Sequence, residues 1–160
     1  MLRKLSLSAA ASALAIMAIA GAADAQDWRL DPAYGNVSLV SGFSPDPHLV
    51  NLQSGGSIDA SASIGGSCRG YIANAPDYRL QYQAGNVLPL IISVNSNADT
   101  TLIINGPDGR WYCDDDSGDG LNPSLRWNSP ASGQYDIYVG TYLNATYQDS
   151  TLSISELRSY

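Results

Sequence analysis

Several residue types are scarce in this 160-residue sequence, and each shortage argues against a class of function. His48 is the only histidine, which excludes a metal site with several histidine ligands and leaves a Ser-His-Asp triad one candidate base. Lys4 is the only lysine, and 15 acidic residues against 8 basic ones disfavour nucleic acid and anionic membranes as partners. Glu156 is the only glutamate. The remaining acidic residues are aspartates, which favour turns over helices.

Residues 1–25 have the three parts of a secretory signal sequence. Two positive charges precede an apolar stretch at 5–20, and Ala23-Asp24-Ala25 is a suitable cleavage site. Because the apolar stretch is alanine-rich and interrupted by serines, it is a poor permanent membrane anchor. No cysteine stands near the cleavage site to carry a lipid. We therefore expect the mature protein to begin near Gln26 and to be periplasmic or secreted, without a stable membrane anchor.

The two cysteines, Cys68 and Cys113, are expected to form one disulfide after export into an oxidising compartment. No other cysteine competes with them. The long loop between them gives the bridge a stabilisation of roughly 4 kcal/mol in the chain-entropy model. A metal-binding or redox pair is disfavoured, because neither a C-x-x-C spacing nor neighbouring histidines are present.

From Gln26 onward, apolar and polar residues alternate with a period of two, which predicts β-strands. The clearest alternating runs are 78–82, 88–94, 102–104, 135–139 and 152–154. Turn clusters separate them; in Asn105-Gly106-Pro107-Asp108-Gly109, proline begins a turn that glycine completes, as in a β-hairpin. We predict an all-β chain: a jelly-roll-like antiparallel β-sandwich of about eight strands with one disulfide.

The chain beyond the signal sequence has the length of a single domain. Residues 26–45 are less regular and are expected to form a lead or an added edge strand. Residues 46–160 are expected to form the sandwich. No internal repeat is visible.

A run of aspartates follows Cys113 and is the best candidate for a ligand site. Four carboxylates, Asp114, Asp115, Asp116 and Asp119, lie close together, with two glycines that let the backbone turn. Ca²⁺ is bound by several such oxygens, so the four are candidate metal ligands and Ca²⁺ is the candidate cofactor. The spacing is not that of an EF-hand, which needs glycine where Asp119 stands. The alternative is a structured turn without metal, in which the side chains accept backbone hydrogen bonds.

Ten tyrosines and three tryptophans against one phenylalanine favour rings with a polar group, which suit wet interfaces. Trp111 and Tyr112 adjoin the acidic loop, and Tyr138 and Tyr142 are expected on the strand face opposite Ile137. The four rings form a candidate ligand surface for a polysaccharide, a peptide or an envelope protein. The alternative is that they pack between and over the sheets.

Several turn motifs follow one another in a characteristic order: Gly106-Pro107-Asp108-Gly109, Asp115-Asp116-Ser117-Gly118, Asn122-Pro123-Ser124-Leu125 and Ala131-Ser132-Gly133-Gln134-Tyr135. With Asp77-Tyr78-Arg79 before them, the pattern resembles the bacterial pre-peptidase C-terminal domain family. The resemblance implies a jelly-roll-like β-sandwich that accompanies a secreted peptidase and aids secretion, folding or substrate binding. The cysteine pair departs from the family pattern, and the calcium ligands of collagen-binding relatives have no match here. We expect the module to stand alone, without a catalytic domain.

Together these features predict an exported, non-catalytic binding or accessory module, stabilised by calcium where the acidic loop holds it. A secreted serine-type peptidase is an alternative. The sequence has neither a Gly-x-Ser-x-Gly nor a Gly-Asp-Ser-Gly motif, and His48 lies in a predicted turn. A peptidase-associated protein and a self-associating envelope or matrix protein are further alternatives.

Overall fold

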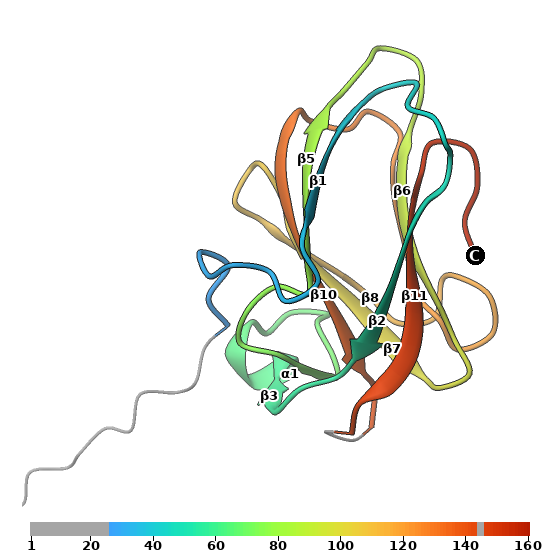
Figure 1. The fold of residues 1–160 in the computed structure, drawn as a ribbon. Helices are drawn as coiled ribbons and strands as arrows, with labels where there is room; N and C mark the ends of the chain where they lie inside the picture. Colours follow the sequence, from blue (N-terminus) through green and yellow to red (C-terminus); the bar gives the residue numbers. More distant parts are fainter. Residues whose placement is uncertain (1–25, 144–145) are drawn as a thin grey trace, which may run out of the picture.

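The computed structural model describes residues 26–143 and 146–160, so the predicted signal sequence lies outside the described residues. This part of the chain forms two β-sheets that pack face to face, with eleven strands and one short helix (Figure 1). The prediction of an all-β sandwich is confirmed. The strands outnumber the predicted eight because short strands form where the sequence shows no alternation. No helix in the described ranges is long and apolar enough to cross a membrane.

The larger sheet, sheet A, has seven strands in the described chain. Its main path runs β1-β5-β10-β4-β3, and β7 pairs with both β10 and β8. Its pairs are antiparallel except β1 with β5, which is parallel and departs from the predicted antiparallel sandwich. The strands are β1 (Asn36–Val40), β3 (Ile58–Asp59), β4 (Tyr71–Ile72), β5 (Tyr78–Gln83), β7 (Thr100–Asn105), β8 (Trp111–Asp114) and β10 (Gly133–Thr141).

The smaller sheet, sheet B, has four strands in the order β2-β11-β6-β9, and its pairs are all antiparallel. Figure 1 shows β2, β6 and β11 of this sheet facing β1, β5 and β10 of sheet A. The strands are β2 (His48–Ser54), β6 (Leu90–Ser96), β9 (Ser124–Trp127) and β11 (Gln148–Ser155).

The main core lies between the two sheets and follows the predicted alternation of apolar residues. Each fully buried aliphatic or aromatic side chain stabilises the fold by about 1.5–3 kcal/mol relative to an exposed one. The buried side chains come from alternate positions of the central strands: Tyr78, Leu80, Tyr82, Leu90, Ile92, Val94, Leu102, Ile104, Tyr135, Ile137, Val139, Leu152 and Ile154.

A second apolar cluster covers one half of the outer face of sheet A. The outward-facing residues of β7 and β10 meet a cover formed by residues 58–72, which include the helix α1 (Ala60–Ser63). Asp59 caps this helix by accepting a hydrogen bond from the Ser61 N–H. Because both faces of β7 are covered, all of its residues are buried. The cluster consists of Ile58, Ala60, Cys68, Ile72, Ile103 and Tyr138.

The predicted disulfide between Cys68 and Cys113 is confirmed, and it fastens this cover to the sheet. Cys68 follows α1, Cys113 lies on β8, and their Cα atoms are 5.0 Å apart.

The expectation that Tyr138 is exposed is wrong, because its ring is fully buried under the cover. The alternation along the strand correctly predicts that Tyr138 faces away from the main core. It does not indicate that residues 58–72 cover this face.

The N-terminal segment, residues 27–35, leads to β1 and is hydrogen-bonded to the chain just before β5. The Asp27 N–H donates to the Asn74 carbonyl at 2.8 Å, and the Tyr34 N–H donates to the Asp77 carbonyl at 2.8 Å. β1 then adds to the edge of sheet A beside β5. The segment therefore has a fixed position from which it reaches the polar half of the outer face.

Candidate functional site

The half of the outer face of sheet A that the second cluster leaves uncovered is polar. Alternation along β5 and β10 turns Arg79, Gln81, Gln134 and Asp136 outward, while their neighbours face the core. Asn105, the last residue of β7, pairs with Asp136 in the strand register. Five polar side chains from three adjacent strands thus come together on one surface.

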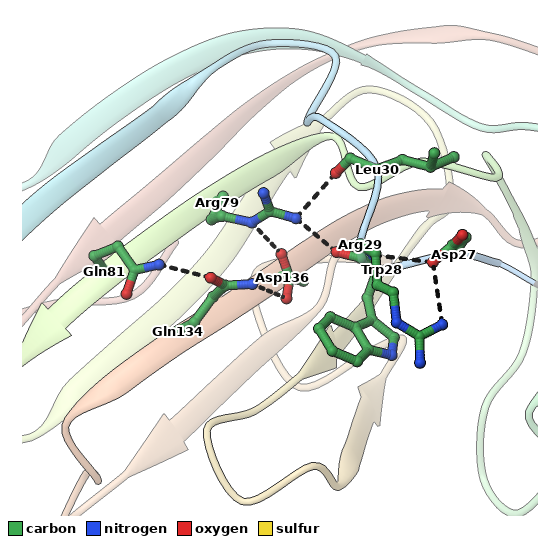
Figure 2. Close-up of polar contacts among 8 residues, drawn as sticks. All are labelled: Asp27, Trp28, Arg29, Leu30, Arg79, Gln81, Gln134 and Asp136. Carbon is green, nitrogen blue, oxygen red and sulfur yellow. Dashed lines mark hydrogen bonds and ion pairs between the residues drawn. The ribbon is translucent and has the colours of Figure 1, made fainter.

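Arg79 holds the N-terminal segment against this surface (Figure 2). Its Nη2 donates to the carbonyl oxygens of Trp28 at 2.6 Å and Leu30 at 3.0 Å, and its Nε donates to Oδ1 of Asp136 at 2.5 Å. The Asp136 side chain is 2% exposed and that of Arg79 is 16% exposed. Because both side chains are shielded from water, loss of either one would leave the other as a buried, unpaired charge. The pair therefore keeps Arg79 in the position from which it binds the N-terminal segment.

Asp136 also ends a chain of amide hydrogen bonds across the two strands, as Figure 2 shows. Gln134 donates Nε2 to Oδ2 of Asp136 at 2.8 Å, and its Oε1 accepts from Nε2 of Gln81 at 2.7 Å. An ionised carboxylate only accepts hydrogen bonds, so it selects one of the two orientations of the Gln134 amide. The polar side chains are therefore ordered before any ligand arrives.

Trp28 supplies the aromatic part of the site. Its carbonyl is held by Arg79, and 38% of the residue is exposed. The guanidinium of Arg29 lies over the indole, 4.9 Å from the ring centroid, a cation–π arrangement. Asp27 accepts the Arg29 N–H at 3.0 Å, which orders the backbone beside the ring.

A hollow of about 270 Å³ lies between Trp28 and the strands. Its far side is the turn of the β7–β8 hairpin, which was predicted and is confirmed. The Gly109 N–H donates to the Gly106 carbonyl at 2.9 Å, and Gly109 has φ = 74°, a conformation that suits glycine. The residues that line the hollow are Trp28, Asn105, Gly106, Pro107, Gly109, Gln134 and Asp136.

Asn105 is the polar side chain of the hollow that has no partner. The residue is only 7% exposed, and its side-chain amide makes no hydrogen bond to another residue in the described ranges. A carboxamide offers two donors and an acceptor oxygen with two lone pairs. Its amide is not among the buried polar atoms without a partner, so solvent reaches it in the hollow and a ligand can bond to it in place of water.

The charges around the hollow cancel. Asp136 is the charged residue among those that line it, and Arg79 neutralises this carboxylate at 2.5 Å. All three acceptors of Arg79 are protein groups, so the guanidinium is already engaged. The hollow therefore favours an uncharged ligand over an anion or a cation.

The acidic loop lies elsewhere, between β8 and β9, and Asp114 has a structural role there. Oδ2 of Asp114 accepts the backbone N–H groups of Ser117 at 3.0 Å and Ser124 at 2.8 Å, and Oδ1 accepts the Ser117 hydroxyl at 2.6 Å. This is a side-chain-capped turn of the kind that the alternative interpretation describes. Asp114 thus stabilises the loop through hydrogen bonds to the protein itself.

Asp99 lies near the acidic loop in space. The sequence did not indicate it as a candidate ligand, because it precedes β7 and is therefore distant from the loop along the chain. Burial raises the pKa of Asp99, and the negative charges of Asp116 and Asp115 raise it further. Its Oδ1 is buried and has no hydrogen-bond partner in the described part of the chain. No three acidic, histidine or cysteine side chains among the described residues form a group that could hold a metal ion. Calcium binding by Asp114, Asp115, Asp116 and Asp119 stays a prediction.

The four predicted surface rings do not form one surface. Trp111 and Tyr112 are neighbours on β8 and therefore face opposite sides of sheet A. Tyr112 packs against the main core, whereas Trp111 packs against Tyr138 in the second cluster, with 5.8 Å between ring centroids. Tyr142 lies beyond the end of β10 and is partly exposed. The four rings thus occupy three different environments.

His48, the one candidate catalytic base, contacts a tyrosine. Its Nε2 lies 3.0 Å from the Tyr78 hydroxyl, and the two rings stack with 5.9 Å between centroids. Burial lowers the pKa of His48. Within the described residues, neither a serine hydroxyl nor a carboxylate is bonded to this histidine, so the contacts of a Ser-His-Asp triad are missing.

A larger hollow of about 400 Å³ lies over sheet B, but its polar groups bond to one another. The Thr151 hydroxyl donates to Oδ1 of Asn51 at 3.1 Å, and the Ser96 hydroxyl donates to the Asp149 carbonyl at 2.8 Å. It has no aromatic wall; its lining consists of Asn51, Leu52, Asn95, Ser96, Asn97, Asp149, Ser150 and Thr151. The hollow beside Trp28 is the stronger candidate.

Sequence reasoning missed the residues of this site, for two different reasons. Gln134 and Asp136 alternate with buried residues of β10, so the strand pattern alone places both on the outer face. The same alternation along β7 places Asn105, its last residue, on the outer face beside Asp136. Trp28 has no such signal, because its position depends on Arg79, a residue distant in the sequence.

No family model matches this chain, and no curated protein sequence matches it. Solved structures that are similar to it include a domain of a collagenase and a periplasmic lysozyme inhibitor. The pre-peptidase C-terminal domain of collagenase from Bacillus anthracis has 13% sequence identity and a TM-score of 0.46, and the match covers 79% of this chain and 99% of that domain. PliG from Aeromonas hydrophila, a periplasmic inhibitor of g-type lysozyme, has 11% identity and a TM-score of 0.40, with 76% of this chain and 96% of that one covered. Both scores lie below 0.5, so neither match carries a functional argument.

Proposed function

We propose that this chain is an exported, non-catalytic binding module that takes an uncharged polar ligand into the hollow beside Trp28. Export is supported by the signal pattern of residues 1–25 and by the Cys68–Cys113 disulfide, since such bonds persist in oxidising compartments. An accessory role beside a secreted peptidase is consistent with this proposal, because the turn motifs resemble those of the pre-peptidase C-terminal domain family.

The observation that carries this proposal is the unpartnered side chain of Asn105 in a hollow whose other polar groups are ordered. Binding sites are mostly concave, with an apolar wall and a few polar groups that fix the orientation of the ligand. Trp28 and Pro107 supply the wall, and Asn105 supplies a donor and an acceptor that the protein itself does not use. Such an arrangement is prepared for a ligand before binding, which lowers the entropy cost of association.

The lining of the hollow supports binding over catalysis. It has no serine, cysteine, lysine or histidine that could act as nucleophile or general base. Its carboxylate, Asp136, is already engaged by Arg79 and Gln134. His48, the candidate base of the peptidase alternative, is not part of the lining.

Saturation-transfer difference NMR tests the proposal with three kinds of probe: methyl hexopyranosides, capped uncharged tripeptides, and the same tripeptides with one Lys or Asp. At least one class of uncharged probe is expected to show saturation transfer with the native protein. The signal should be strongly reduced with Asn105→Ala and with Trp28→Ala, because these variants remove the free amide and the aromatic wall.

Asn95→Ala and Tyr147→Ala are the matched controls, because both residues are exposed and neither lines this hollow. Both should bind the uncharged probe as the native protein does. The proposal fails if no uncharged probe binds, or if every probe binds the Asn105→Ala and Trp28→Ala variants as well as the native protein.

A further inference from the structure

The free polar groups of the hollow match ring hydroxyls. A sugar hydroxyl donates one hydrogen bond and accepts others, and two adjacent hydroxyls can engage the oxygen and nitrogen of one carboxamide. Asn105 offers such a carboxamide. Asp136 keeps lone pairs beyond its bonds to Arg79 and Gln134, so it can accept from a further hydroxyl.

The apolar groups of the hollow match the other side of a sugar ring. A pyranose presents a face of C–H groups, and flat aromatic surfaces pack well against apolar faces whose edges are polar. The indole of Trp28 and the ring of Pro107 are the apolar walls here. Arg79 holds the backbone of Trp28 through its carbonyl, and the guanidinium of Arg29 lies over the indole, so both the main chain and the ring of Trp28 have protein contacts without a ligand.

Three other classes of ligand fit the same groups less well. An extended peptide needs free main-chain groups, but the N–H and carbonyl of Gly106 already bond to Arg110 and Gly109. A phosphate or carboxylate needs a free cation, but Arg79 is taken by three protein acceptors, and Arg29 lies over the Trp28 ring beside the carboxylate of Asp27. A purely apolar ligand would leave the amide of Asn105 unpaired.

We infer that the hollow binds one ring of a neutral saccharide. This inference rests on the proposed function and names the ligand class of the same site. The volume of about 270 Å³ lies just under the range of about 300–1,000 Å³ that holds drug-sized ligands, so a single ring enters and the rest of the saccharide stays outside. Trp28 packs against the C–H face of the ring, and Asn105 bonds to two of its hydroxyls.

The test is a protein-observed NMR titration of the ¹⁵N-labelled protein produced from the complete chain. The probes are methyl α- and β-hexopyranosides, neutral oligosaccharides, and a capped uncharged tripeptide. A saccharide is expected to shift the side-chain amide signals of Asn105 and Gln134 and the indole N–H signal of Trp28. Asn105→Ala should weaken its binding at least tenfold, because the variant loses both hydrogen bonds and one such bond accounts for up to about tenfold, whereas Asn95→Ala should leave it unchanged.

The possible outcomes separate the inference from the proposed function. If the tripeptide shifts these signals and no saccharide does, the inference is wrong and the binding module stands. If no probe shifts them, both are wrong. Saccharide binding that Asn105→Ala leaves unchanged also overturns the inference, and the backbone spectrum of each variant shows whether it is folded.

Discussion

The outer face of sheet A has two halves, and different kinds of contact hold the segment that covers each half. The same two strands contribute to both: Ile103 and Tyr138 belong to the apolar half, and Asn105 and Asp136, two residues away on each strand, belong to the polar half. The apolar half is closed by packing and a disulfide, whereas the polar half is partly covered by a segment that hydrogen bonds hold. The packed half also has polar atoms without a partner, the Tyr138 hydroxyl among them, but they are buried beneath the cover, whereas the side chain of Asn105 lines the hollow.

Breaking the Cys68–Cys113 disulfide should have the largest effect on stability, because it removes the covalent closure of the apolar half. For a bridge with a sequence separation of 45 residues, the expected loss is about 4 kcal/mol in the chain-entropy model. Urea unfolding of a double variant, Cys68→Ser with Cys113→Ser, measures this loss. A difference below about 1 kcal/mol would show that packing alone closes this half.

Arg79→Ala tests the polar half in the same way, and about 3 kcal/mol should be lost, because Asp136 would remain as an unpaired buried charge. The N-terminal segment should also come loose, which hydrogen exchange of the Asp27 and Tyr34 amides would report. Arg126→Ala is the control, since this residue is exposed on β9. If the amides of the segment stay protected without Arg79, another contact holds the cover.

The two halves also differ in how far the sequence predicts them. Alternation predicted the main strands and turned Tyr138 outward, but no local pattern shows that residues 58–72 fold back over it. The disulfide could be predicted, because only Cys68 and Cys113 are available. The cover of the polar half could not be predicted, since it depends on a contact between Trp28 and Arg79, which are distant in the sequence. Short-range periodicity predicts strands, whereas covers depend on long-range contacts.

Asp77 lies where the two halves meet, and it should make the stability of the fold depend on pH. Its Oδ2 accepts the Val139 N–H at 2.7 Å, and its carbonyl accepts the Tyr34 N–H at 2.8 Å. Burial raises the pKa of the Asp77 carboxyl to about 7, although the hydrogen bond from Val139 acts in the opposite direction. Above its unfolded pKa and below about pH 7, the folded state therefore binds more protons than the unfolded state, and stability falls as pH rises.

Between about pH 5 and pH 7 the free energy of unfolding should fall by about 2 kcal/mol from this group alone. Asp77→Asn keeps an oxygen that can accept from Val139 but does not titrate, so this part of the pH dependence should vanish. Urea unfolding at several pH values compares the two proteins. Parallel pH profiles would mean that Asp77 ionises normally in the folded state.

Asp114 follows Cys113 directly, and its substitution tests whether the acidic loop is a structural extension of the apolar half or a separate ion site. Asp114→Ala removes the acceptor of three hydrogen bonds and should cost about 1–2 kcal/mol, the range for loss of a cap. A structural turn loses the same amount in calcium as in EDTA. Calcium binding, as predicted from the sequence, would instead raise the melting temperature of the native protein, and the double variant Asp115→Asn with Asp116→Asn would abolish that rise.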